Sequence, residues 1–195
     1  PGYSMKPAPI SEMTTGGIVK FLWDDKYLYV GARLDDEDVI AENNTDQAHH
    51  YRFGDLLEMF IRPPKNAMYW ELYCTPLGNK TAFMLPNGGR CFLPSCGTYT
   101  GMKGMKVAAK VDGTVNKWQD KDKGWTAEMA IPIKDLTAYG DKFAPGQIWR
   151  FFVGRYNYSR YNSNLELLGI TEFKDDQTSY HYKRNWGTLK IVKDK

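Results

Sequence analysis

Two glutamates interrupt otherwise apolar segments of this chain: Glu58 within residues 55–62 (DLLEMFIR) and Glu71 within residues 68–75 (MYWELYCT). Both segments have the composition of β-strands, where glutamate is a poor strand former. A carboxylate in the middle of each strand therefore indicates a polar task on one face of a sheet. The alternative is a solvated face on which both glutamates pair with nearby arginines, since charged residues are mostly exposed.

Paired carboxylates can serve as the acid and the base of a glycosidase, whose separation sets the stereochemical outcome. Nothing in the segments around these two glutamates guarantees the raised pKa that such a role needs. The sequence contains no Ser-His-Asp order and no nucleophile elbow. We therefore expect a binding or structural role for the pair, and no enzymatic activity in the domain itself.

A sugar offers hydroxyl groups, which carboxylates and guanidinium groups bind, and a C–H face, which packs on aromatic rings. Predicted strands carry groups of the first kind at Glu58, Glu71, Tyr73 and Arg155. Predicted loops carry aromatic rings of the second kind at Tyr51, Phe53, Tyr180 and Tyr182. Together they predict a shallow sugar site on a sheet. The alternative is that these rings cap the ends of the fold.

Three aspartates, Asp35, Asp36 and Asp38, begin a long acidic stretch (35–54) that lacks helical periodicity and is predicted to be a loop. Their carboxylate oxygens are suitable ligands for Ca²⁺, although the spacing is not that of an EF-hand loop. A solvated acidic turn is the alternative interpretation.

The elements that would position these residues are strands. In residues 27–34, the apolar Leu28, Val30, Ala32 and Leu34 alternate with other residues, a period of two typical of a half-buried strand. Further strands are predicted at 17–23, 55–62, 68–75, 79–85, 106–113, 124–132, 147–160 and 185–192, with a helical turn within 131–140 and loops at 1–16, 35–54, 86–106 and 159–185. About nine strands without a long helix predict an all-β fold, an antiparallel β-sandwich.

Length and composition suit one domain over residues 1–195, with a core at about 17–193. Apolar residues make up 42% and charged residues 25%, a balance typical of soluble globular proteins. The net charge of +3 is spread along the chain and gives no indication of nucleic-acid binding. No apolar run approaches the length of a membrane span.

The chain has three cysteines, so at least one has no partner within the chain. Cys91 and Cys96 flank a short loop, and we expect them to form a disulfide if the protein is secreted. Cys74 lies in a predicted strand and is expected to be a buried, unpaired thiol.

The order of six segments resembles carbohydrate-binding module family 9. The similarity runs from about Val19 to Val192 and is carried by residues 23–39, 54–63, 69–78, 124–136, 145–157 and 185–192. The resemblance implies a β-sandwich that binds sugars, often the reducing ends of glucans or xylans. It also implies a domain linked covalently to a catalytic domain of a secreted protein, and hence an extracellular, periplasmic or cell-surface location. No cofactor is required.

The resemblance also implies roles for particular residues. The family's D-x-x-E motif matches Asp55 and Glu58, and Glu58 would contact the sugar. The polar contacts on later strands would fall at Glu71, Tyr73 and Arg155.

The two tryptophans that sandwich the sugar in the family are replaced in this chain. Arg52, next to Tyr51, stands near the first position, and Tyr180 stands at the second, with Gln177 near a polar contact. We expect Tyr180 to act as an exposed platform in a loop, with little effect on stability when it is replaced. Because some members of the family bind structural calcium, the resemblance also favours a calcium ion at Asp35–Asp38.

Two other functions remain open. The family is related to DOMON sandwiches, some of which bind haem, and a haem domain would need an axial pair of Met, His or Lys inside the sandwich. A structural or docking sandwich without a glycan ligand is the third possibility, which the two replaced tryptophans keep open.

Overall fold

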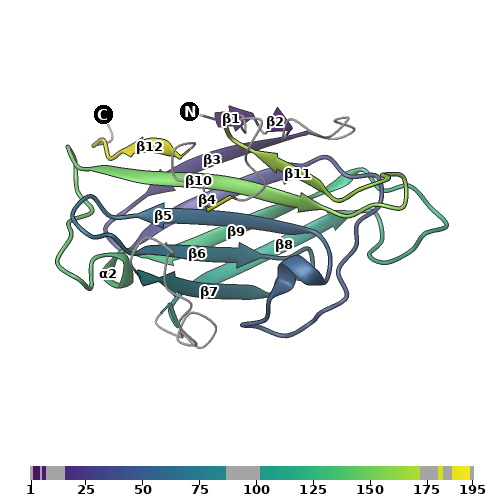
Figure 1. The fold of residues 1–195 in the computed structure, drawn as a ribbon, viewed down its shortest axis with the longest axis horizontal. Coiled ribbons are helices and arrows are strands. Elements are labelled where there is room, and N and C mark those ends of the chain that lie inside the picture. Colours follow the sequence, from purple (N-terminus) through teal and green to yellow (C-terminus); the bar gives the residue numbers. More distant parts are fainter. Residues whose placement is uncertain are drawn as a thin grey trace.

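The computed structural model describes residues 16–86, 102–171, 180–181 and 186–193 in full and the backbone of residues 2–4 and 6–7. In these ranges the chain forms two antiparallel sheets that face each other, with one short helix, α2 (Ile133–Leu136), and one 3-10 turn, η1 (His50–Arg52) (Figure 1). The prediction of an all-β sandwich is confirmed. No helix in this part of the chain has the length and apolar character needed to cross a bilayer.

The smaller sheet has five strands in the described part of the chain, in the order β1-β3-β4-β9-β8. These strands are β1 (Gly2–Ser4), β3 (Gly17–Trp23), β4 (Tyr27–Leu34), β9 (Gly124–Pro132) and β8 (Lys106–Asp112). We call it the five-stranded sheet.

The larger sheet has seven described strands, in the order β2-β11-β10-β5-β6-β7, with β12 also paired with β10. These strands are β2 (Lys6–Pro7), β11 (Glu166–Gly169), β10 (Ile148–Asn157), β5 (Leu56–Arg62), β6 (Tyr69–Cys74), β7 (Lys80–Leu85) and β12 (Gly187–Lys190). We call it the seven-stranded sheet.

The strands predicted from alternation are present, because the period of two follows from the pleat of the backbone. In β4, for example, the four alternating apolar residues are all buried, as expected. Three strands were not predicted: β1, β2 and β11 lie in segments expected to be loops. They have three, two and four residues, which is too short for a periodic pattern to stand out.

The hydrophobic core lies between the sheets and includes three tryptophans with at most 2% of their surface exposed: Trp70, Trp125 and Trp149. Large side chains fill this space, which argues against the haem alternative. Strands β5 and β6 are buried at every position except Arg62, so their outer face is covered as well. This second buried face explains why their sequences are nearly continuous apolar runs rather than alternating ones.

An ion pair without solvent exposure joins the two sheets at one end. Arg155 of β10 points into the interior, and its Nη2 lies 2.5 Å from Oδ2 of Asp36, which follows β4. The same guanidinium donates to the backbone oxygen of Asp35 at 2.5 Å and to Oδ1 of Asn157 at 2.8 Å. Asn157 Nδ2 in turn donates to Glu166 on β11 at 2.6 Å. The network thus connects β10 with its neighbour and with the opposite sheet.

We predict that Arg155→Met lowers the free energy of unfolding by about 3–5 kcal/mol, because it leaves the buried carboxylate of Asp36 without its cation. Urea denaturation of both proteins measures the change. The matched control is Arg33→Met, since Arg33 pairs with Asp35 on the surface at 4.0 Å with both side chains exposed. Its expected effect is about 0–1 kcal/mol. Equal effects of the two substitutions would contradict this assignment.

Candidate functional site

The outer face of the seven-stranded sheet carries a polar cluster at its centre. Glu58 of β5 is paired in register with Tyr73 of β6 and with Gly154 of β10, and Glu71 lies two residues before Tyr73 on the same face. The prediction that the two glutamates share a face is therefore confirmed. Glu58 is 2% exposed, Glu71 6% and Tyr73 1%, so the alternative of a solvated face is wrong.

One of the two carboxylates, that of Glu71, has polar partners on both of its oxygens. The Tyr73 hydroxyl donates to Oε1 of Glu71, and Oε2 of Glu71 lies 3.7 Å from Nε2 of His181. Nδ1 of His181 is 2.6 Å from the hydroxyl of Tyr69, so a chain of polar groups runs from β6 to the covering turn. In contrast, Oε2 of Glu58 has no hydrogen-bond partner in the described structure.

Burial raises the pKa of Glu58 well above its ordinary value of 4.5, and the neighbouring Glu71 carboxylate raises it further. The pKa values of the Tyr73 and Tyr156 hydroxyls are also raised, first by burial and then by the two carboxylates. Both phenols therefore stay protonated. The Tyr73 proton is already donated to Glu71, so the Tyr156 hydroxyl is the donor that is available to a ligand. The cluster can hold a proton between its carboxyl groups and can bind a ligand that donates hydrogen bonds to it.

Tyr180 covers this cluster and is not an exposed platform, so that expectation is wrong. Its side chain is 4% exposed, and its hydroxyl donates to the backbone oxygens of Arg155 at 2.5 Å and Leu168 at 2.9 Å. Its ring packs on Phe152 and meets Tyr156 edge to face. A Cβ on Gly154 would lie 2.7 Å from this ring, so glycine at that position lets the ring approach the sheet.

Tyr51 and Arg52 lie at the margin of the same face, in η1. The Tyr51 ring is half-buried and lies 6.0 Å from the ring of Tyr156, while the Arg52 guanidinium sits 5.3 Å from the Tyr51 ring centre. Tyr51 is therefore placed to form an aromatic wall beside the cluster. Gln177, Tyr182, Cys91 and Cys96 lie outside the described residues. Cys74 is buried and unpaired, as expected.

The expectation that Arg155 contacts the sugar is wrong for this arrangement. Alternation places Arg155 on the inner face of β10, while Gly154 and Tyr156 are on the outer face with Glu58. The Arg155 guanidinium is completely buried between the sheets and is paired with Asp36. It cannot reach a ligand on the other side of its own sheet.

The three aspartates proposed for calcium do not fit a shared ion. Asp36 is paired with Arg155, and Asp38 accepts from Nη1 of Arg160 at 3.1 Å and from its backbone N–H at 2.7 Å. The Asp35 side chain is exposed. In the ranges that the structure covers, no group of three or more Asp, Glu, His or Cys side chains could hold a metal ion. The calcium expectation therefore has no support from this geometry.

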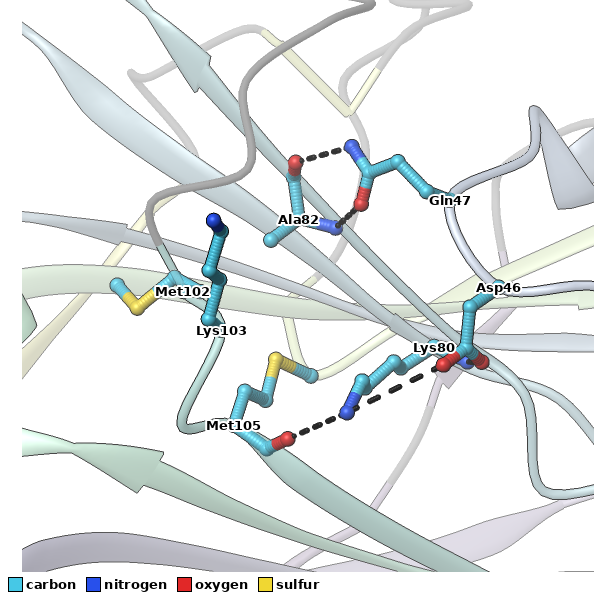
Figure 2. Close-up of a pocket in the computed structure, with 7 residues that line it drawn as sticks. All are labelled: Asp46, Gln47, Lys80, Ala82, Met102, Lys103 and Met105. Carbon is cyan, nitrogen blue, oxygen red and sulfur yellow. Dashed lines mark hydrogen bonds and ion pairs between the residues drawn. The ribbon is translucent and has the colours of Figure 1, made fainter.

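Several hollows in the described structure lie away from the polar cluster, among them one at the edge of β7 and one on the five-stranded sheet. A pocket of about 220 Å³ borders the edge of β7, where the Gln47 amide bonds both the N–H and the C=O of Ala82 (Figure 2). Lys80 completes its wall by donating to the Met105 backbone oxygen at 2.8 Å. Gln47 thus closes an exposed strand edge, which protects it from pairing with another chain. The second hollow, of about 620 Å³, is an open groove over Gly31 and Glu128 on the five-stranded sheet.

Sequence reasoning missed three members of the cluster: Tyr69, Tyr156 and His181. The period of two held a signal for Tyr69, which precedes Glu71 by two residues and so shares its face. Pairing across β5 and β10 likewise places Tyr156 on the face of Glu58. His181 carried no such signal, because it lies in a turn outside the strands.

The two facing antiparallel sheets define a β-sandwich. The family described as "Carbohydrate family 9 binding domain-like" matches residues 4–194, nearly the whole chain. This chain belongs to that family, whose members are non-catalytic binding domains. The resemblance found in the sequence is confirmed.

Solved structures show the same fold at low sequence identity. A candidate carbohydrate-binding protein from Bacteroides uniformis ATCC 8492 superposes with a TM-score of 0.70 and 13% identity, over 96% of this chain and 85% of that one. A family 9 module from Caldicellulosiruptor kristjanssonii in complex with cellotriose gives 0.59 and 15%, over 95% and 80%. The module in complex with glucose gives 0.60 and 16%, over 95% and 81%. No curated protein gives a significant sequence match.

We predict that Tyr180→Ala lowers the free energy of unfolding by about 3–5 kcal/mol, because it removes a buried ring. Tyr180→Phe keeps the ring and loses the hydroxyl, at a cost of about 1–3 kcal/mol. Chemical denaturation measures both changes. Trp118→Ala, at a site 70% exposed, is the control and should change stability by less than about 0.5 kcal/mol. A stable Tyr180→Ala protein would show that the ring does not seal this face.

A second prediction concerns pH. Because the pKa of Glu58 is higher in the folded than in the unfolded state, the folded protein retains this proton longer, and its stability falls as pH rises above 4.5. Glu58→Gln cannot ionise, so its free energy of unfolding should fall less between that pH and neutrality. Urea denaturation across this range tests the difference. Glu128→Gln, on the exposed outer face of β9, should follow the parent. Parallel curves for the parent and Glu58→Gln would contradict the shift.

Proposed function

We propose that this domain binds the ends of oligosaccharide or polysaccharide chains at the Glu58–Glu71 cluster, as a non-catalytic module of a secreted glycan-processing protein. The observation that carries the proposal is the free Oε2 of Glu58, a buried acceptor without a donor. Buried polar groups are nearly always hydrogen-bonded, and an exception calls for an explanation. A sugar hydroxyl would supply the missing donor.

The surroundings of Glu58 support a sugar as the ligand. Tyr73 and Tyr156 contribute hydroxyl groups, while the half-buried ring of Tyr51 contributes an apolar wall. Sugar sites combine a few convergent polar groups with aromatic surface, and this face offers both. The cluster lies on rigid strands, which hold the polar groups in place before a ligand arrives.

The wider setting of the proposal rests on the family. Its membership makes a carbohydrate the ligand class, and neighbours of the same fold have been solved with cellotriose and with glucose. We expect an extracellular, periplasmic or cell-surface location and a covalently linked catalytic domain in the parent protein. Fractionation of the source cells would test the location. The size and the catalytic activity of the parent protein would test the linked domain.

We predict that Glu58→Ala weakens oligosaccharide binding about tenfold, because it leaves a buried sugar hydroxyl without its partner, which costs about 1–3 kcal/mol. Isothermal titration calorimetry with gluco- and xylo-oligosaccharides is the measurement. The matched control is Glu128→Ala, which removes an exposed carboxylate from the groove on the opposite sheet. If Glu128→Ala loses binding and Glu58→Ala retains it, the sugar binds in that groove and the assignment to the outer face of the seven-stranded sheet falls.

A further inference from the structure

Glu58 differs from the other buried acids in the described chain. Asp36 is paired with Arg155, and Asp38 with Arg160. The others accept hydrogen bonds from backbone or side-chain groups: Asp55, Glu71, Asp122, Asp141 and Glu166. Oε2 of Glu58 alone among their carboxylate oxygens is both buried and without a partner. Glu58 is therefore the one buried acid among the described residues with a buried oxygen that no donor reaches.

The side chains around Oε2 of Glu58 give this part of the outer face a negative character. Glu58 is next to Glu71, and the phenols that face the pair are Tyr73 from β6 and Tyr156 from β10, with Tyr180 above them. The described structure records no contact of Glu58 with an arginine or a lysine. Such a pair needs either a retained proton or a cation from outside, since two carboxylates in one buried site repel each other.

A metal ion does not fit this need. The described residues form no group of three or more acidic, histidine or cysteine side chains that could ligate one. The phenols of Tyr73 and Tyr156 stay protonated and so carry no negative charge that would ligate a metal ion. Besides a retained proton and the His181 ring beside Glu71, the remaining source of positive charge is the ligand itself.

We propose that this site selects sugars that carry a protonated amino group, such as a glucosamine unit at a chain end, over neutral and acidic sugars. The proposal rests on the carbohydrate-binding function proposed above. An ammonium group has three donors and no acceptor, so it satisfies Oε2 of Glu58 and neutralises the pair with Glu71. Its hydrogen bonds to carboxylates are roughly twice as strong as those between neutral groups.

Neutral, acidic and N-acetylated sugars fit this site less well than an amino sugar. A neutral hydroxyl donates one hydrogen bond and brings no positive charge, so the pair keeps its proton. A uronic acid brings a third carboxylate to the same place, and like charges at close range are unfavourable. N-acetylation removes the charge of an amino sugar while keeping its nitrogen, which makes it a matched comparison. The expected order of affinity is amino sugar, then neutral or acetylated sugar, then acidic sugar.

Binding of the cation should release a proton. The empty pair retains one because burial and Glu71 raise the pKa of Glu58, and an ammonium group beside it lowers that pKa again. Nε2 of His181 lies 3.7 Å from Oε2 of Glu71, so His181→Gln serves as a control for the contribution of this ring. Neutral sugars should bind without this proton release.

The test is calorimetry at mildly acidic pH with four trisaccharides of one linkage: glucose, glucosamine, N-acetylglucosamine and glucuronate units. We expect the glucosamine trisaccharide to bind about tenfold or more tightly than the glucose trisaccharide. Titrations in buffers of different ionisation enthalpy should show release of about one proton for the glucosamine ligand. Glu58→Gln should abolish this preference, while Glu128→Gln and His181→Gln should retain it.

The outcomes separate the two proposals. If the glucose trisaccharide binds as tightly as the glucosamine one, selection for amino sugars is overturned and the proposed function stands. If the preference survives in Glu58→Gln, the cation is bound elsewhere and the inference is also overturned. If none of the four trisaccharides, nor any gluco- or xylo-oligosaccharide, binds the parent protein, both proposals fall together.

Discussion

The ion pair between Arg155 and Asp36 determines how the central strand of the larger sheet is oriented. It places a buried guanidinium on the inner face of β10, at the end of the row that begins with Trp149. Because side chains alternate, Gly154 and Tyr156 must then face outward, beside Glu58 of β5. A buried charge is tolerated when its partner and most of its hydrogen bonds are in place. Here both Nη atoms of Arg155 are bonded, and Nε is left without a partner in the described structure. The outer polar face thus depends on an interaction inside the core.

Buried charged groups are compensated on the inner face of the seven-stranded sheet but not on its outer face. Between the sheets, Arg155 and Asp36 neutralise each other and bond to backbone oxygens. On the outer face, Oε2 of Glu58 has no such partner among the described residues, and burial together with the neighbouring Glu71 raises the pKa of its carboxyl group. Proteins tolerate local departures of this kind chiefly at functional sites, while the rest of the fold supplies the stability. The well-packed core provides that reserve in this domain.

The aromatic residue at the second family position contributes differently from what the family pattern implies. Tyr180 packs its ring on the sheet and bonds two backbone oxygens through its hydroxyl, so it belongs to the structure that covers the cluster. Gly154 makes this approach possible. Recognition of a ligand in this chain therefore rests, in our proposal, on the carboxylates and on rings at the margin such as Tyr51.

The sequence by itself determined the longer strands and the sandwich class, because the period of two is a local property of the backbone. The face that Glu58 and Glu71 share also depends on the register in which β5 pairs with β6. Tertiary structure decided the rest. Both faces of β10 are largely apolar, so alternation could not tell which face points into the core. It therefore could not tell whether Arg155 is inside or outside. Its partner Asp36 lies 119 residues away, and the ring of Tyr180 is buried by strands distant in sequence. Partners of this kind are chosen by packing between sheets, which no local pattern encodes.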